Sequence, residues 1–235
     1  MKKLTVKQTA EFLREQNDIV ILSHRKPDGD TIGTSAFLCR LLRAMGKRAW
    51  VLKNPELTPK YACLHQGLSK DWPEEGDTLV CVDAGAAYML PDAHKALKDR
   101  IVLRIDHHGS ATPFAKYELV DSTAAACGEI VYDLIMLLGA TLDKNMANAL
   151  YTAISTDTGC FRFGNTQSHT LEVAAACTAV SGNMSEINRS LFTVRSFKRM
   201  KLEAWIIEHL QLAQDGKVAV CALPLAVEQT MGLTE

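Results

Sequence analysis

The chain has 235 residues, of which 47% are hydrophobic and 23% are charged, and its formal net charge is −1 at pH 7. These values give no sign of disorder, and the absence of a basic excess argues against a nonspecific nucleic-acid coat. The basic start is not followed by an apolar signal core, and no apolar run approaches the roughly 20 residues that span a bilayer. Seven cysteines without a C-x-x-C pair indicate reduced thiols and a cytoplasmic location.

The first 120 residues alternate between short apolar runs and helical patterns. Thr5 and Gln8 form a capping box that begins a first helix. Further helices are expected at 31–45, 61–64 and 91–98, and His65 and His94 are expected at the surface. The alternation predicts an α/β fold, a mainly parallel sheet flanked by helices on both faces. Its strands are expected at 18–23, 46–52, 77–83, 101–106 and 117–120.

The second half of the chain is mostly helical. Asp121-Ser122-Thr123 is expected to cap a helix over 124–138, whose N-terminus either binds a phosphate or is closed by that local cap. We expect a catalytic domain over 1–195, a connecting helix over 196–214 and the start of an incomplete substrate-binding domain over 215–235. In that last segment the strand at 217–223 has no visible partner. The other helices of this half are expected at 145–156, 168–180 and 185–191, with one more beginning at 224.

Polar side chains that bind cations or move protons follow several apolar elements. The carboxyl ends of parallel strands meet at one edge of a sheet, where ligands collect. Taken singly, each of these groups of polar residues can also be explained as a turn, a helix cap or a surface histidine. Taken together, the groups favour one shared site. Mixed imidazole and carboxylate ligation suits Mn²⁺, with Mg²⁺ or Zn²⁺ as alternatives. The candidates are His24, Asp28, Asp30, Asp83, Asp106, His107, His108 and Asp157.

Residues close to some of these candidates refine the expectation. Ala84 and Gly85 leave space around Asp83, so this carboxylate is placed to bridge two metals. Asp157 ends a predicted helix, where a carboxylate opposes the helix dipole, so a cation should compensate it, either a metal or Arg162. Gly33 allows a close backbone approach or serves helix packing.

The clusters together resemble the four motifs of the DHH phosphoesterase superfamily. The motifs read His24-x-x-x-Asp28-x-Asp30, Val82-Asp83, Asp106-His107-His108 and Ser155-Thr156-Asp157-Thr158-Gly159. The likeness extends from about residue 18 to residue 165. The Asp121-Ser122 pair and the segment 158–166 resemble in particular the NanoRNase/pAp phosphatase branch.

The resemblance implies a two-metal hydrolase, usually dependent on Mn²⁺, that acts on 3′-phosphoadenosine 5′-phosphate (pAp) and very short oligonucleotides. It assigns Asp106 to orienting an imidazole and His108 to stabilising charge or donating a proton at the scissile phosphate. One ion is then held by His24, Asp28 and Asp83, and the other by Asp30, Asp83, His107 and Asp157.

One departure from the family and two alternatives remain. Members carry a C-terminal DHH-associated domain with a Gly-Gly-Gly-His substrate clamp, a motif that this sequence does not contain. We therefore expect metal binding to survive while affinity and turnover on nucleotides are weak. The alternatives are an inorganic pyrophosphatase or exopolyphosphatase of the same superfamily, and a non-catalytic metal- or nucleotide-binding module. A homodimer through the apolar helices is also expected.

Overall fold

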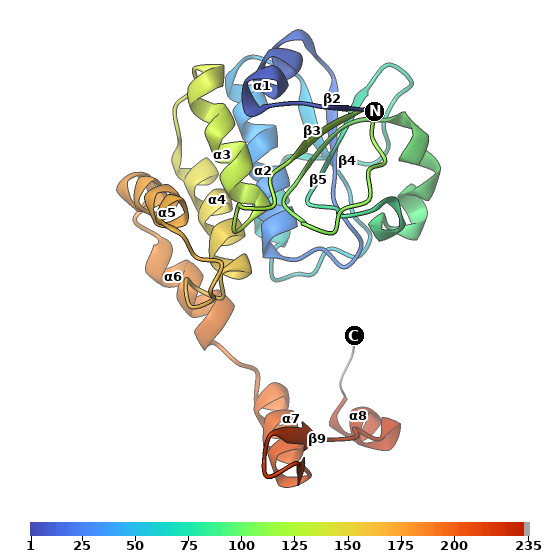
Figure 1. Ribbon diagram of the computed structural model, residues 1–235, viewed down its shortest axis with the longest axis vertical. Coiled ribbons are helices and arrows are strands. Elements are labelled where there is room, and N and C mark those ends of the chain that lie inside the picture. Colours follow the sequence, from blue (N-terminus) through green and yellow to red (C-terminus); the bar gives the residue numbers. More distant parts are fainter. Residues whose placement is uncertain (233–235) are drawn as a thin grey trace. The chain divides into compact units, whose positions relative to one another are not determined.

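The computed structural model describes residues 1–232, and its chain divides into two compact units, Met1–Asn188 and a second that starts at Arg189 (Figure 1). The first unit contains a seven-stranded sheet in the order β1-β7-β6-β5-β2-β3-β4, in which every neighbouring pair is parallel. The predicted α/β fold with its parallel sheet is therefore confirmed.

Five of the seven strands were expected from the sequence. The two others, β1 and β4, are two residues long and lie at the two edges of the sheet, where pairing with a neighbour defines them rather than an apolar pattern. The strands are β1 (Lys2–Lys3), β2 (Ile19–Leu22), β3 (Ala49–Leu52), β4 (Ser69–Lys70), β5 (Thr78–Val82), β6 (Ile101–Asp106) and β7 (Tyr117–Val120).

Helices cover both faces of the sheet. Leu90 and Leu97, in and near the 3₁₀ helix η3 (Asp92–Arg100), pack against one face. The other face is covered by α2 and α3, with α4 packed on α2 as a further layer (Figure 1). The helices of this unit are α1 (Val6–Glu15), α2 (Gly29–Ala44), α3 (Cys127–Leu138), α4 (Lys144–Asp157), α5 (Ser168–Ser181) and α6 (Met184–Asn188), with short 3₁₀ helices η1 (Ala62–His65) and η2 (Ala87–Met89).

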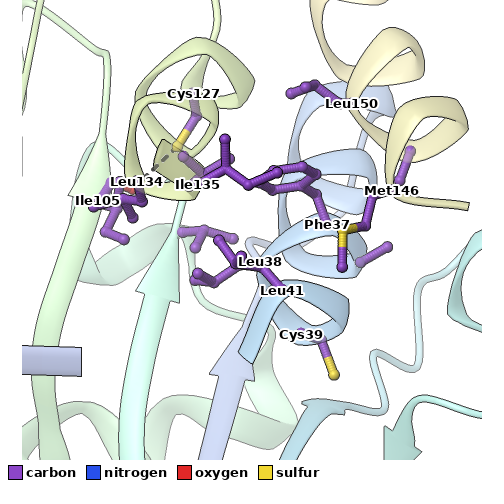
Figure 2. Packing of buried hydrophobic residues seen from close by; sticks show 14 of the residues in the cluster. Phe37, Leu38, Cys39, Leu41, Ile105, Cys127, Leu134, Ile135, Met146 and Leu150 are labelled. Atoms are coloured by element: carbon purple, nitrogen blue, oxygen red, sulfur yellow. Dashed lines mark hydrogen bonds between the residues drawn. The ribbon is translucent and has the colours of Figure 1, made fainter. Parts of the chain in front are cut away.

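The main core lies between the sheet and α2, α3 and α4 (Figure 2). Phe37 of α2, Leu134 of α3 and Leu150 of α4 are fully buried there. Cys127 at the start of α3 donates its thiol hydrogen to the Ile105 carbonyl of β6, with a sulfur to oxygen distance of 3.3 Å. This packing holds the ends of three helices next to the carboxyl ends of the strands.

Two glycines allow α2, α3 and α4 to approach closely. A Cβ atom on Gly33 would lie 2.3 Å from the carbonyl oxygen of Ala149, and one on Gly128 would lie 2.8 Å from Cβ of Ala153. Both distances are shorter than any real Cβ contact, so the helix contacts require glycine at these positions. Gly33 therefore serves helix packing, one of the two roles expected for it.

The second unit is built from short elements. A π-helical turn (η4, Arg189–Thr193) leads to α7 (Phe197–Glu208), and a hairpin of β8 (Gln211–Ala213) and β9 (Val218–Val220) precedes α8 (Leu225–Met231). The prediction of one helix over 196–214 was wrong, because the helix ends at Glu208. The strand expected without a partner pairs antiparallel with β8.

Two histidines are buried where the sequence predicted surface positions, so both predictions were wrong. His65 and His94 are each 3% exposed. The His65 ring nitrogen Nε2 lies 2.9 Å from the Ser35 hydroxyl of α2, and the His94 ring centre lies 6.2 Å from that of Trp72.

All seven cysteines are free, as expected. Within residues 1–232, none of the helices combines the length and apolar character needed to cross a bilayer.

Candidate metal centre

The candidate side chains gather at the point where the strand order of the sheet reverses, beside β2. β2 lies between β3 and β5; the chain runs from β2 to β3 on one side, then returns to β5 and continues to β6 on the other. Loops that leave such neighbouring strands diverge and open a crevice at the carboxyl edge. His24 follows β2, Asp83 follows β5 and Asp106 ends β6.

Asp83 lies at the centre of the cluster. It is 2% exposed and has a left-handed backbone conformation, with φ at +54°. Its Oδ2 accepts a hydrogen bond of 2.6 Å from the Thr31 hydroxyl, whereas its buried Oδ1 has no hydrogen-bond partner in the described part of the chain. Nε2 of His24 lies 3.7 Å from Oδ2, and Nε2 of His107 lies 3.4 Å from Oδ1. One carboxylate thus faces an imidazole on each side.

On one side of Asp83, His24 and Asp28 complete a group of three potential ligands. Nε2 of His24 lies 3.8 Å from Oδ1 of Asp28, which caps the N-terminus of α2. The other ring nitrogen, Nδ1, donates to the Arg25 carbonyl oxygen at 2.6 Å. Because that bond orients the ring through Nδ1, Nε2 faces the two carboxylates and is the atom that a cation between them would take as a ligand.

On the other side, His107 lies between Asp30 and Asp157. Its Nε2 is 3.6 Å from Oδ2 of Asp30 and 3.3 Å from Oδ2 of Asp157, the last residue of α4. Its Nδ1 is 3.3 Å from the carbonyl oxygen of Ala124, to which it donates. These three residues form a second group of potential ligands, so the ring of His107 is oriented in the same way as that of His24.

The N-terminus of α3 is closed by Asp30, a residue of α2. The Asp30 carboxylate accepts from the backbone amides of Cys127 at 2.6 Å and of Gly128 at 3.0 Å. The expected cap by Asp121 was wrong, because this side chain accepts instead from the amide and hydroxyl of Thr123 in a local turn. The Asp30 carboxylate therefore occupies the helix N-terminus that the sequence offered as a phosphate-binding site.

Asp106 connects to the second histidine of the motif. Its Oδ1 accepts from Nδ1 of His108 at 2.7 Å, and its Oδ2 lies 3.2 Å from a guanidinium nitrogen of Arg104. The His108 side chain is 38% exposed, whereas Asp106 is fully buried. The arrangement leaves Nε2 of His108 for a ligand that enters the crevice.

The electrostatics of the cluster reflect an excess of negative charge. Burial raises the pKa of Asp30 well above its usual value and that of Asp157 to about 7, and the Asp83 charge adds to both shifts. Burial disfavours the imidazolium forms of His24 and His107, but the surrounding carboxylates outweigh it and raise both pKa values to about 10. Protonated imidazoles thus compensate the carboxylates, a role that divalent cations also perform.

The donor set fits divalent cations. The three ligand atoms of each group lie within 4.8 Å of one another, and a third group, Asp83, His107 and His108, shares Asp83 with the first group and His107 with the second. Oδ1 of Asp83 is a buried anionic oxygen without a hydrogen-bond donor among the described residues, and a cation would satisfy it. The alternative compensation of Asp157 by Arg162 was wrong, because Nε of Arg162 donates to the Gly159 carbonyl oxygen at 2.6 Å.

A family model described as "DHH family, N-terminal domain" matches residues 18–154, more than half of the chain. The chain belongs to the DHH family. The expected resemblance is thereby confirmed, and the match spans the first three DHH motifs, with Asp157 of the fourth just beyond it.

Proteins similar to this DHH chain include two with the name "Bifunctional oligoribonuclease and PAP phosphatase NrnA". That of Thermus thermophilus is 36% identical over 197 residues, which are 81% of this chain and 59% of the relative. That of Bacillus subtilis is 25% identical over 207 residues, which are 86% of this chain and 65% of the relative. The chain therefore spans less than two thirds of the length of either.

Two solved structures share the DHH fold. An exopolyphosphatase-related protein from Bacteroides fragilis superposes with a TM-score of 0.82 at 22% identity, over 98% of this chain and 72% of that one. A putative family II inorganic pyrophosphatase from Methanococcus jannaschii gives 0.52 at 19% identity, over 73% and 60%. At such identities the likeness concerns the fold alone.

Three residues that support the DHH motifs were not singled out from the sequence. Thr31 fixes Asp83, and Asn54 donates to the carbonyl oxygen of His24 at 2.8 Å. Arg104 binds Asp106 from within β6. Of the three, only Arg104 carries a clear signal in the sequence, since a charged residue interrupts an apolar run of strand length.

Proposed function

We propose that the chain is a divalent-metal-dependent phosphoesterase that hydrolyses pAp and short oligoribonucleotides, with Mn²⁺ as its ion and Mg²⁺ as the alternative. The observation that carries the proposal is the buried Asp83 carboxylate, which faces His24 and His107 and has one oxygen without a hydrogen-bond donor. The substrate class is supported by relatives named as oligoribonuclease and PAP phosphatase.

Two sets of ligands share Asp83. One ion would be held by His24, Asp28 and Asp83, and the other by Asp30, Asp83, His107 and Asp157. When bound, such ions neutralise charge on a phosphate and make water a nucleophile at neutral pH. A chain with a net charge of −1 needs such local compensation to accept an anionic substrate.

The chain's own groups hold the ligands in a defined orientation. Backbone carbonyl oxygens accept the Nδ1 protons of His24 and His107, so both rings present Nε2 to the carboxylates. The Thr31 hydroxyl fixes one oxygen of Asp83 and leaves the other directed toward His107. This preorganisation lowers the cost of arranging the ligands when a metal binds.

His108 and Asp106 are the proposed catalytic pair. The hydrogen bond from Nδ1 to Asp106 orients the His108 ring and raises the pKa of its imidazole. The partly exposed Nε2 edge then donates to a phosphate oxygen, where it stabilises developing charge or gives a proton to the leaving oxygen. Asp106 acts through this imidazole, because both of its own oxygens are already hydrogen-bonded.

The test compares the wild-type chain with Asp83→Asn in a calorimetric titration with Mn²⁺ and in hydrolysis of pAp and of a diribonucleotide. We expect Mn²⁺ binding and product release by the wild type, and loss of both in the variant. Asp99→Asn is the matched control, because Asp99 is an exposed carboxylate on η3, away from the candidate ligands.

Other outcomes would replace the proposal. Phosphate release from pyrophosphate but not from pAp would assign an inorganic pyrophosphatase. Mn²⁺ binding without hydrolysis of any of these substrates would assign a non-catalytic binding module. The homodimer and the cytoplasmic location stay predictions.

A further inference from the structure

Arg104 is a charged residue in the middle of a buried strand. β6 has a paired neighbour on each side, and strands of this kind normally contain only apolar residues. Alternate side chains of a strand share a face, so Leu103 and Ile105 join the main core while Arg104 and Asp106 point to the opposite face. Arg104 is only 1% exposed, which makes it one of the largest fully buried side chains.

One guanidinium group connects β6 with β7 and with the loop after β5. Its Nε donates to Glu118 of β7, which is also buried. Its NH1 lies 3.2 Å from Oδ2 of Asp106, 3.0 Å from the Ala84 carbonyl oxygen and 3.1 Å from that of Gly85. Because Ala84 and Gly85 directly follow Asp83, the contacts reach both the DHH motif on β6 and the loop after β5.

Glu118 is itself held in place. Its second oxygen, Oε1, accepts from the backbone amides of Phe114 and Ala115, both at 3.0 Å. A continuous series of hydrogen bonds thus runs from the amides of residues 114–115 through Glu118, Arg104 and Asp106 to the imidazole of His108. The planar guanidinium fixes directions that a flexible ammonium group would not.

Fold stability is a poor explanation for this buried charge. Removing charged groups from water is costly, and apolar residues of similar volume often replace buried ion pairs without loss of stability. The Arg104 and Glu118 pair nevertheless lies directly behind the residue that orients His108. The position of this ion pair therefore suggests that it helps to orient Asp106 and His108.

We propose that Arg104, held by Glu118, is a positioning residue that acts through Asp106 to orient the His108 imidazole toward substrate. The proposal rests on the proposed function where it concerns turnover. Loss of Arg104 frees one oxygen of Asp106, so this carboxylate can turn and the partly exposed His108 ring can leave its productive orientation.

A double-mutant cycle tests the coupling to His108. Arg104→Gln and His108→Gln are made singly and together, and kcat and KM for pAp are measured with Mn²⁺. We expect Arg104→Gln to lower kcat by about 10- to 100-fold with little change in KM. In the His108→Gln background the same change should cost less than about threefold. Equal fold losses in the two backgrounds would show a merely structural role and overturn the proposal.

Two further variants protect the test against misfolding. Glu118→Gln keeps Arg104 paired with Asp106 and still offers an acceptor to the 114–115 amides, so it leaves fewer uncompensated charges than Arg104→Gln. Its kcat loss should be smaller and should also vanish in the His108→Gln background. Arg48→Gln is the matched control: Arg48 pairs with Asp18 at the amino ends of β3 and β2, and its removal should leave kcat unchanged.

A spectroscopic measurement separates this proposal from the proposed function. The ring nitrogens of His108 are observed in metal-free protein by long-range ¹H–¹⁵N NMR and assigned with His108→Gln. Arg104→Gln should shift them as Asp106→Asn does, and Arg48→Gln should not. Shifted signals in a protein without phosphoesterase activity would retain the positioning role and reject the proposed function. Unshifted signals in Arg104→Gln would reject the positioning role whatever the activity.

Discussion

The two carboxylate oxygens of Asp83 have different surroundings, and this difference suits the residue to the proposed role of a bridge between two metal ions. The Thr31 hydroxyl holds Oδ2, and Oδ1 lacks a donor while it lies 3.4 Å from Nε2 of His107. Buried anionic oxygens are rarely left in this state unless a water or an ion completes them. The side chain of Thr31 therefore fixes the orientation of the Asp83 carboxylate, which is the proposed shared ligand.

Replacement of Thr31 by valine tests this control. Val keeps the shape of Thr but removes the hydroxyl that donates to Asp83. We expect Thr31→Val to weaken Mn²⁺ binding by about 10- to 100-fold in a calorimetric titration, because supporting contacts of this kind affect metal affinity to that extent. Thr31→Ser, which retains the hydroxyl, should stay close to the wild type. Equal affinities of the Val variant and the wild type would contradict the role of Thr31.

His65 gives a prediction about pH and stability. Burial lowers its pKa from the ordinary 6.5 to about 4. Between these values the unfolded chain binds more protons than the folded chain, so the free energy of unfolding rises with pH. The contribution of His65 is complete above pH 6.5 and decreases as the pH falls toward 4, by about 2 to 3 kcal/mol.

Urea unfolding of the wild type and of His65→Gln at pH 7 and pH 4.5 measures this contribution. The variant has no imidazole to protonate, so its stability should fall less between the two pH values than that of the wild type. Parallel losses in both proteins would show that His65 does not contribute to acid sensitivity.

The sequence identified polar residues at strand ends but not the burial of His65 and His94. A ligand-type residue after an apolar strand is a local signal, and β2, β5 and β6 each provide one. Burial of a histidine in a short helix depends on partners from other elements, such as Ser35 and the Ile32 carbonyl oxygen for His65. No pattern within the short helix itself contains that information.

At the scale of elements, the approach of α2 to α4 brings two ligand-bearing helix ends together. In α2, Gly33 follows Asp30 by about one helical turn, and it lies against the backbone of Ala149 in α4. α4 then ends at Asp157. A side chain between the helices would push them apart. The positions of the proposed ligands Asp30 and Asp157 therefore depend on this close contact.

Gly33→Ala should destabilise the protein by about 1 to 3 kcal/mol, because its Cβ would lie 2.3 Å from a carbonyl oxygen. The matched control is Gly76→Ala, where a Cβ meets nothing within 4 Å and the backbone needs no positive φ. The control should change stability by less than about 0.5 kcal/mol in either direction. Comparable melting temperatures of the two variants would contradict the packing argument.

Element boundaries show where local sequence patterns stop being informative. Five strands of the parallel sheet were predicted because short apolar runs rich in β-branched residues are distinctive, and the two-residue edge strands β1 and β4 have no such run. The start of α3 was misplaced because its cap, Asp30, lies 97 residues from Cys127 in the sequence. β8 was read as the end of a helix because short apolar runs such as Leu210 and Leu212 fit both periods, whereas β9 lies within the strand expected at 217–223.

At the scale of the whole molecule, the sheet concentrates negative charge at one edge of a chain that is almost neutral overall. Ligand-type residues from β2, β5, β6 and α4 converge there, and protonated imidazoles compensate them when no metal is bound. A divalent cation would replace this compensation and would bind the folded chain far better than the unfolded one, because the proposed ligands come from segments far apart in the sequence. Binding must therefore raise the stability of the fold.

We expect Mn²⁺ to raise the melting temperature of the wild-type chain, relative to the same protein in EDTA. At a free concentration of 100 times Kd, one site contributes about 2.7 kcal/mol, which corresponds to several degrees for a chain of this size. Asp83→Asn should lose most of this increase, because Asp83 belongs to both of the proposed ligand sets, whereas Asp99→Asn should keep it. Each variant is compared with its own metal-free state, which removes any effect of the substitution on the fold itself. An equal increase in Asp83→Asn would mean that Mn²⁺ stabilises the chain from another place, and the shared-carboxylate centre would then be rejected.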